Sequence, residues 1–402
     1  MSTTRFDFTP FVPDETALEQ SDLPDKAMEL VRAAASLKGG FSLISMETIT
    51  CHMAVINSYY SNLIEGHATL PHEVRAAQQG DFSEDPAKRD LQLESLAHIE
   101  VQHWLRQQHF MLDQLFAPET IQLIHQRFYE QVPENLWVVR NPDTGKEEKL
   151  VPGQWRQRGV RVGAHIPPEH SRIPDLMQSF GEIYSGLQFR GDRRIIAVLA
   201  AHHRFAWIHP FLDGNGRVGR LLTDAALRAI GFESYGLWCL SRGLARQSQS
   251  YRTMLAGADK ARQGDYDGRG ALTEQGLMQF CDYMLDTALD QVQYMADLLK
   301  LDKMRERLRA YVRARADARV PGIEGELHES AALVLYQAFV DGELARADAL
   351  RLTGMSERSG RRVLKQLKED GLLSETSSRS PLRWEVPQHA EPWYFPQLAP
   401  GY

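Results

Sequence analysis

Apolar positions recur at helical spacing along most of this chain. Helical patterns dominate residues 23–107, and the largely apolar residues 195–207 predict a buried helix. A different pattern, with an apolar side chain at every second position, covers residues 160–164 between glycines and predicts a short strand or hairpin. We therefore expect a mainly α fold that is interrupted by one hairpin.

The pattern changes beyond residue 300. Residues 304–315 predict an arginine-rich connector helix, and the proline and glycines of residues 321–325 predict a hinge. Three short helical segments and a stretch typical of a β-wing follow, at residues 330–340, 344–352, 357–370 and 380–386. Ser356 is placed to cap the third helix. This order resembles a winged helix-turn-helix, so we expect a small α+β domain over residues 326–402.

The third of these helices is basic. Its side chains would suit phosphate or groove contacts with DNA, and they are Arg358, Arg361, Arg362, Lys365 and Lys368. Two other interpretations stay open, because such domains also serve as protein-interaction or dimerisation modules and a basic helix is often a solvated face.

Composition narrows the class of protein. A chain of 402 residues has room for two or three domains, and 43% hydrophobic with 25% charged residues argues against a mainly disordered protein. A net charge of −7 argues against a nucleic-acid or membrane coat. The three cysteines lie far apart and form no zinc or disulfide pattern. With no apolar signal segment or membrane-length stretch, we expect a cytoplasmic protein.

The candidate chemistry concentrates in residues 209–220, HPFLDGNGRVGR. Pro210 and the glycines at positions 214 and 216 would break the preceding helix, and helical spacing resumes at Arg217. A helix that begins there offers unpaired backbone N–H groups to an anion. Gly214 and Gly216 let the anion approach that backbone closely.

The side chains of this stretch suit other parts of a nucleoside triphosphate. Asp213 is a hard oxygen ligand of the kind that Mg²⁺ takes together with phosphate oxygens. Asn215 adds side-chain donors, while the forks of Arg217 and Arg220 match phosphate oxygens from one helix face. His209 can accept a proton from an incoming hydroxyl. Any fragment alone would more often be structural, but here all the parts coincide.

With no position missing, this stretch resembles the core motif of Fic-domain proteins, which typically transfer AMP from ATP to a protein hydroxyl. The resemblance implies a protein adenylyltransferase with His209 as its base, ATP as substrate and Mg²⁺ as cofactor. Other members transfer UMP, phosphocholine or phosphate. The implied organisation is a Fic-type helical core with a β-hairpin flap at residues 111–300, an N-terminal helical region at residues 1–110 and a connector at residues 301–325.

The upstream sequence SNLIEG resembles the inhibitory-helix motif of the family, with Ser61, Glu65 and Gly66 at the motif positions. The resemblance implies that Glu65 pairs with Arg220 and so denies that arginine to the γ-phosphate of ATP. Glu65 would stand at the C-terminal end of a helix over about residues 48–66, where the helix dipole disfavours a carboxylate. An exposed glutamate before a helix stop is the simpler alternative.

The predicted hairpin is similar to the flap of the family, which holds a target segment by main-chain pairing. The candidate target-binding residues are Val160, Arg161, Val162 and Gly163. An ordinary surface hairpin is the alternative.

Residues 250–255 resemble the helix that shapes the nucleobase pocket of Fic proteins. Tyr251 and Asp259 are the candidate nucleobase contacts, although Arg252 stands where the family pattern has a second tyrosine. A plain core aromatic is the alternative interpretation of Tyr251.

Three functions therefore compete. The first is an adenylyltransferase that modifies a Ser, Thr or Tyr hydroxyl of a target protein or of its own chain and is held inactive by Glu65. The second is the reverse enzyme, in which Glu65 positions water to remove AMP and His209 protonates the leaving hydroxyl. The third is a DNA-binding regulator that acts through residues 326–402. We expect ATP and a protein as partners, no membrane, and a homodimer.

Overall fold

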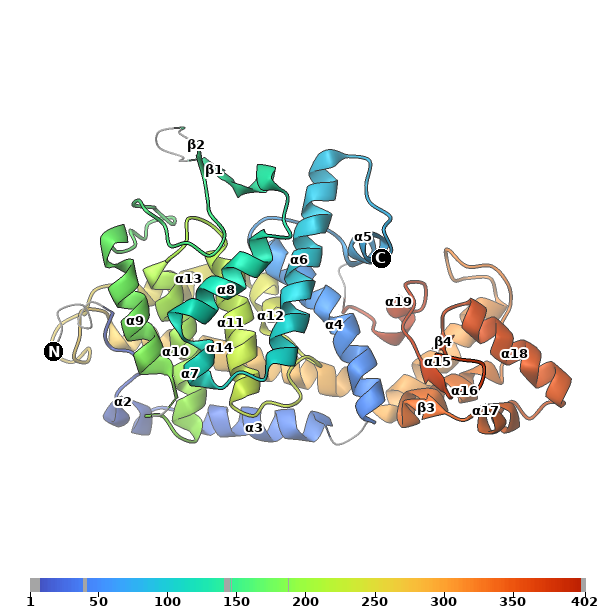
Figure 1. The fold of residues 1–402 in the computed structure, drawn as a ribbon. Helices are drawn as coiled ribbons and strands as arrows, with labels where there is room; N and C mark the ends of the chain where they lie inside the picture. The colour runs from blue at the N-terminus through green and yellow to red at the C-terminus, as the bar shows by residue number, and fades with distance from the viewer. Residues whose placement is uncertain (1–7, 39–41, 141–144, 146, 187, 399–402) are drawn as a thin grey trace. The chain divides into compact units, whose positions relative to one another are not determined.

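The computed structural model describes residues 8–38, 42–140, 145, 147–186 and 188–398. The chain divides into two compact units. The first comprises Met1–Ala35, Asn57–Tyr235 and Cys239–Gln291, and the second comprises Ser36–Ile56, Gly236–Trp238 and Val292–Tyr402. The predicted mainly α fold is confirmed (Figure 1). The boundaries expected after residues 110, 300 and 325 stay predictions.

Helices build most of the first unit, and three helices have residues in both units, α3, α4 and α14. None of the described helices combines the length and apolar composition that a membrane span requires. The helices are α2 (Glu15–Glu19), α3 (Leu23–Lys38), α4 (Leu43–Ile64), α5 (Pro71–Gln78), α6 (Pro86–Gln108), α7 (Leu112–Leu115), α8 (Pro118–Tyr129), α9 (Ile173–Tyr184), α10 (Asp192–Ile208), α11 (Asn215–Ala229), α12 (Leu240–Arg246), α13 (Ser248–Ala258) and α14 (Glu274–Leu298), with short 3₁₀ turns at Glu134–Trp137 and His170–Arg172.

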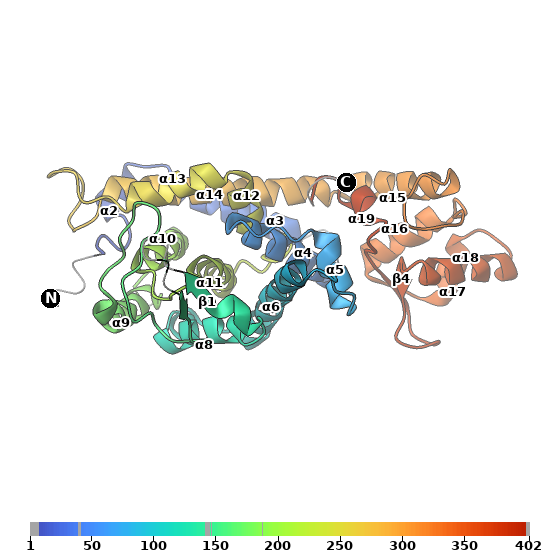
Figure 2. The same ribbon diagram turned by 90° about the horizontal axis from the view of Figure 1, so that it is seen from above.

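The centre of the first unit is α10, the helix predicted at residues 195–207. It packs against α9 and α11, and Figure 2 shows α10 and α11 between α14 on one side and α8 and α9 on the other. Every side chain from Ile195 to Phe205 is buried, as expected for a helix covered on all sides. Its polar members are paired: His202 contacts Thr223 and Tyr251 at 2.7 Å each. The buried helix α10 thus leads directly into the motif of residues 209–220.

The hairpin prediction is only partly confirmed. Residues 160–164 form no regular strand; a single antiparallel bridge joins Val162 to His165, with both backbone hydrogen bonds at 3.0 Å. Gly163 turns the chain between them at φ 59°. The regular hairpin of the first unit lies earlier, where β1 (Val138–Arg140) pairs antiparallel with β2 (Glu147–Lys149).

The second unit contains the helices predicted beyond residue 300. Ser356 accepts the N-cap hydrogen bond of α18 from Ser359, as expected. A three-stranded antiparallel sheet has the order β3–β5–β4, and Trp384 of β5 is buried against Phe339. The winged-helix assignment itself stays a prediction. The elements are α15 (Leu301–Ala316), α16 (Ala331–Asp341), β3 (Glu343–Leu344), α17 (Arg346–Leu352), α18 (Glu357–Glu369), β4 (Leu373–Ser374), β5 (Leu382–Trp384) and α19 (Glu391–Tyr394).

Candidate active site

The predicted helix–loop–helix is present at residues 209–220. Helix α10 ends at Ile208, and the backbone of the next residue, His209, is left-handed at φ 50° and ψ 61°. Helix α11 begins after Gly214, which has φ 79°. A residue other than glycine rarely adopts a left-handed backbone, so His209 must be held there by its surroundings.

Arg156 supplies much of that support. Its backbone N–H donates to the Pro210 carbonyl at 2.9 Å, and its Nε donates to the His209 carbonyl at 2.8 Å. The guanidinium also donates to the carbonyls of Arg158 and Pro168. Arg156 is buried, so one side chain fixes the backbone at the base of the loop.

Asn215 closes the other side of the loop through its side chain. We expected its side chain to donate to phosphate, but the Nδ2 donates to the Phe211 carbonyl and the Oδ1 accepts from the Phe211 N–H, both at 2.9 Å. Asn215 is 4% exposed. Its amide therefore shapes the loop, and its contact with phosphate stays a prediction.

His209 carries a neutral imidazole at physiological pH. Burial, together with the charges of Arg156 and His165, lowers its pKa to about 4. A hydrogen bond to the Ala206 backbone fixes one ring nitrogen, which leaves the other as an acceptor. The imidazole is thus in the form that can accept a proton.

The N-terminus of α11 has the geometry of an anion site. The first backbone bond of the helix runs from the Val218 N–H to the Gly214 carbonyl at 2.9 Å, so the N–H groups of residues 215–217 precede the ladder. A methyl group added to Gly216 would collide with the Glu65 Oε1. The carboxylate of Glu65 therefore lies directly on the backbone where a phosphate would approach.

Glu65 also contacts Arg220, as the motif implied. The Arg220 Nη2 donates to the Glu65 Oε1 at 2.6 Å. Ser61 contributes twice, because its hydroxyl and its carbonyl each accept from Arg220 at 2.9 Å. Burial by itself would raise the pKa of Glu65, but Arg220 and Arg217 outweigh it and hold that pKa below its ordinary value. An ionised carboxylate therefore lies at the N-terminus of α11 and pairs with the guanidinium of Arg220.

The end of the helix that bears Glu65 is defined by two residues. Gly66 turns the chain at φ 92°, just beyond α4. Arg252, the residue that departs from the family pattern, donates from its Nη2 to the Ile64 carbonyl at 3.1 Å. A cation at a helix C-terminus is favourable, so Arg252 stabilises this end of α4.

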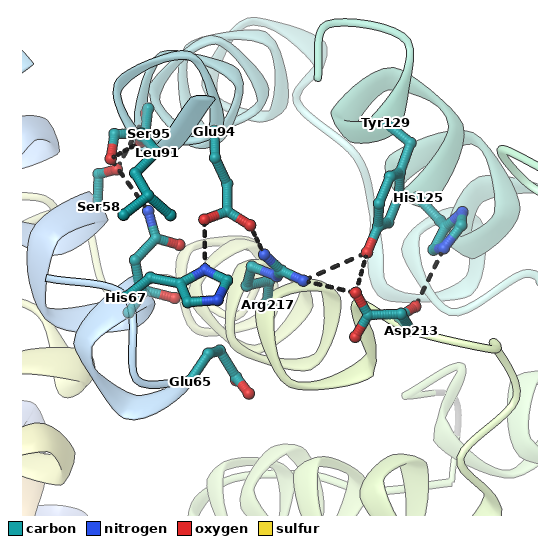
Figure 3. A network of polar contacts seen from close by, with 12 residues as sticks. Ser58, Glu65, His67, Leu91, Glu94, Ser95, His125, Tyr129, Asp213 and Arg217 are labelled. Atoms are coloured by element: carbon teal, nitrogen blue, oxygen red, sulfur yellow. Dashed lines mark hydrogen bonds and ion pairs between the residues drawn. The ribbon is translucent and has the colours of Figure 1, made fainter. Parts of the chain in front are cut away.

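Arg217 lies in a different environment from the one expected of a free phosphate ligand. Its side chain is 4% exposed and forms an ion pair with Glu94 of α6. Its Nη2 donates to the Asp213 Oδ2 at 3.1 Å and to the Tyr129 hydroxyl at 3.2 Å (Figure 3). The guanidinium of Arg217 is therefore engaged on both sides, by a buried carboxylate and by the loop.

Asp213 fits the predicted metal ligand. Its Oδ2 accepts from Tyr129 at 2.7 Å and from Arg217, which orients the carboxylate, and its side chain is 46% exposed. His125 donates to the Asp213 carbonyl at 3.2 Å and stacks on Phe211. Within the described ranges no cluster of three or more histidine, cysteine or acidic side chains could hold a metal. One oriented carboxylate suits Mg²⁺ that arrives with phosphates.

The predicted flap is linked to the end of α10. His165, the bridge partner of Val162, contacts the Trp207 carbonyl at 2.8 Å through its Nε2. Arg161, Val162 and Gly163 are exposed, and Val160 is half-buried. This segment thus presents free surface beside the end of α10.

The two candidate nucleobase residues do not share one surface. Tyr251 is buried, and its hydroxyl contacts His202 inside the fold, which favours the interpretation as a core aromatic. Asp259 is half-buried and lies 3.1 Å from the Nε2 of His203 and 3.8 Å from the Nδ1 of His165. Only Asp259 therefore borders the flap segment.

Comparison with known proteins shows that this site lies in a region similar to Fic proteins. A family model described as Fic/DOC family matches residues 115–227. The protein adenylyltransferases Fic of Drosophila mojavensis and Drosophila grimshawi are 35% and 34% identical over 88 residues, 22% of this chain. This match covers only 18% of the length of each relative.

Solved structures share the fold at low sequence identity. A Fic family protein from Desulfovibrio desulfuricans matches with a TM-score of 0.52 and 18% identity, over 90% of this chain and 96% of that one. Fic-1 from C. elegans matches with a TM-score of 0.53 and 14% identity, over 71% and 76%. Residues 115–227 of this chain form a Fic/DOC-family domain.

Proposed function

We propose that this protein transfers AMP from ATP to a hydroxyl side chain of a protein and that Glu65 inhibits the transfer. The observation that carries the proposal is the Glu65 carboxylate on the N-terminus of α11 and on Arg220. A backbone cradle and a guanidinium that together hold one anion would hold another, and phosphate groups match both.

The transfer follows from the placement of His209. Its free ring nitrogen takes the proton of the target hydroxyl while that oxygen attacks the α-phosphorus of ATP. A new phosphorus–oxygen bond forms, the bond to the bridging oxygen of the β-phosphate breaks, and pyrophosphate leaves. The N–H groups of residues 215–217 stabilise the developing charge.

Asp213 would hold Mg²⁺ in this scheme. The metal, when bound, neutralises charge on the phosphates and supplies no step of its own here. Tyr129 and Arg217 keep the Oδ2 of the carboxylate oriented, and the Asp213 side chain is 46% exposed. Arg220 would hold the γ-phosphate only after Glu65 has left it.

The test compares wild type, Glu65→Gly, and Glu65→Gly with His209→Ala in the full chain. With [α-³²P]ATP, protein label is expected in Glu65→Gly alone, and [γ-³²P]ATP should give none. Glu84→Gly, at an exposed position before α6, is the matched control and should behave as wild type. Label from the γ-position would show phosphate transfer instead, and equal label in wild type and Glu65→Gly would refute inhibition.

Removal of AMP is the second candidate. The ionised Glu65 interacts electrostatically with His209, and a carboxylate there could accept a proton from water. Incubation of AMP-modified protein with wild type and with Glu65→Gly would separate the two reactions. AMP release by wild type that is lost in Glu65→Gly would favour removal.

A further inference from the structure

Glu94 holds two parts of the site with its two carboxylate oxygens. Its Oε1 pairs with Arg217 of α11, and its Oε2 accepts from the Nδ1 of His67 at 2.6 Å (Figure 3). His67 lies two residues after Glu65 in the chain. The Glu94 carboxylate of α6 thus contacts both Arg217, at the start of α11, and His67, in the segment that follows the inhibitory Glu65.

The Arg217 side of this contact is buried. Both side chains of the pair are 4% exposed, and a buried charge is strongly disfavoured once its partner is removed. Arg217 in turn donates to Asp213 and to Tyr129. The direction of the candidate metal ligand therefore depends on Glu94 through a continuous chain of contacts.

The His67 side is accessible. The His67 side chain is 41% exposed, against 4% for Glu94. Burial and the charge of Arg217 lower the pKa of His67, so a neutral imidazole donates its Nδ1–H to the carboxylate. Because Gly66 gives the backbone freedom between them, this hydrogen bond ties the chain beyond Glu65 to α6.

We propose that Glu94 is a positioning residue with two opposed effects: it orients Arg217 and Asp213 for transfer, and through His67 it anchors the inhibitory segment. The proposal rests on the proposed function. It predicts that the two ends of one contact network change activity in opposite directions when they are removed.

The first test replaces His67 in an otherwise wild-type chain. His67→Ala should raise AMP transfer about tenfold or more, because a hydrogen bond to a charged group no longer holds the segment. The control is His72→Ala, on the neighbouring α5, which should leave transfer unchanged. In a Glu65→Gly background His67→Ala should add nothing, since no inhibitory carboxylate remains to be anchored. Unchanged transfer in His67→Ala would overturn the anchoring part.

The second test replaces Glu94 in the Glu65→Gly background. Glu94→Gln should lower transfer about ten- to a hundredfold and raise the Mg²⁺ concentration needed for half-maximal rate, as expected for a residue that supports a metal ligand. Glu100→Gln, at an exposed position of the same helix, is the control. An unchanged Mg²⁺ requirement would overturn the proposal that Glu94 orients Asp213. A variant that only lost stability would transfer less AMP but keep the same Mg²⁺ requirement.

A measurement without catalysis separates this proposal from the proposed function. Amide hydrogen exchange in residues 62–68 of the full chain should quicken in His67→Ala and in Glu94→Gln, and not in the two controls. If Glu65→Gly transfers nothing from any nucleotide, the proposed function fails while faster exchange still supports the anchor. Unchanged exchange overturns the anchor whatever the activity. Should Glu94→Gln not fold, the His67 variants alone decide.

Discussion

His209, the proposed general base, has a left-handed backbone conformation, and burial lowers the pKa of its imidazole. Burial lowers that pKa to about 4, so the ring stays neutral throughout the physiological range. A general base acts only when deprotonated, and activity limited by His209 is therefore lost only as pH falls towards that value. Glu65 raises the pKa of His209, so its removal shifts the loss to still lower pH.

The resulting pH profile is a direct check. The single-turnover rate of AMP transfer by Glu65→Gly should show no inflection between pH 6 and pH 8. An imidazole with the ordinary value of about 6.5 would give one in that range. Such an inflection, absent from nucleotide binding measured at the same pH values, would contradict the lowered pKa.

Arg156 is the residue that holds His209 in its strained conformation. Arg156→Ala leaves the carbonyls of His209, Arg158 and Pro168 without their donor, so we expect unfolding free energy to fall by about 2 kcal/mol. Urea denaturation measures this loss. Arg161→Ala, at an exposed position of the same segment, is the control, and an equal loss in both variants would refute the role given to Arg156.

At the scale of elements, one added methyl group can test whether the N-terminus of α11 binds the phosphates of ATP. Gly216→Ala fills the space now held by Glu65 while suiting a helix at least as well as glycine. In the Glu65→Gly background it should weaken ATP binding about tenfold or more without lowering stability. Calorimetric titration measures the affinity, and unchanged binding would show that the phosphates lie elsewhere.

The prediction that residues 326–402 bind DNA concerns helix α18. Arg358 and Arg362 are exposed, and neither forms an ion pair among the described residues, whereas Arg361 and Lys365 pair with glutamates of the same helix. Specific DNA binding by the full chain should be weakened by Arg358→Glu with Arg362→Glu and should fall as salt rises. Gel shifts on genomic fragments test this; no difference between variant and wild type would exclude α18 as the contact.

Sequence patterns predicted secondary-structure elements better than they predicted the contacts between side chains. The apolar run of α10 and the breakers at residues 210–216 follow from local chemistry, so the helix–loop–helix was predictable. The contact between Glu94 and Arg217 was not predictable, because it requires α6 to lie against α11 and joins residues 123 positions apart in the chain. A charged residue at a buried helical position was the one available signal. The contact of the Asn215 side chain with Phe211 spans only four positions, but it depends on the folded conformation of the loop and not on a sequence pattern.

At the scale of the whole molecule, the candidate site belongs to one unit. Glu65, Glu94, His209, Arg217 and Arg220 all fall within the first compact unit. A ligand that binds only the folded site stabilises what it touches, by about 2.7 kcal/mol at a hundredfold excess over Kd. ATP should therefore protect the first unit and leave the elements beyond α15 unchanged.

Hydrogen exchange resolved along the full chain can measure this protection. In Glu65→Gly, ATP with Mg²⁺ should slow exchange in α11 and in the segment around His209, while α16 and α18 keep their rates. Wild type should show little protection anywhere, because Glu65 already occupies the cradle. Protection that extends to α16 and α18 would mean that nucleotide binding is coupled to the second unit, and the inhibitory segment, whose α4 belongs to both units, would be the first place to look for that coupling.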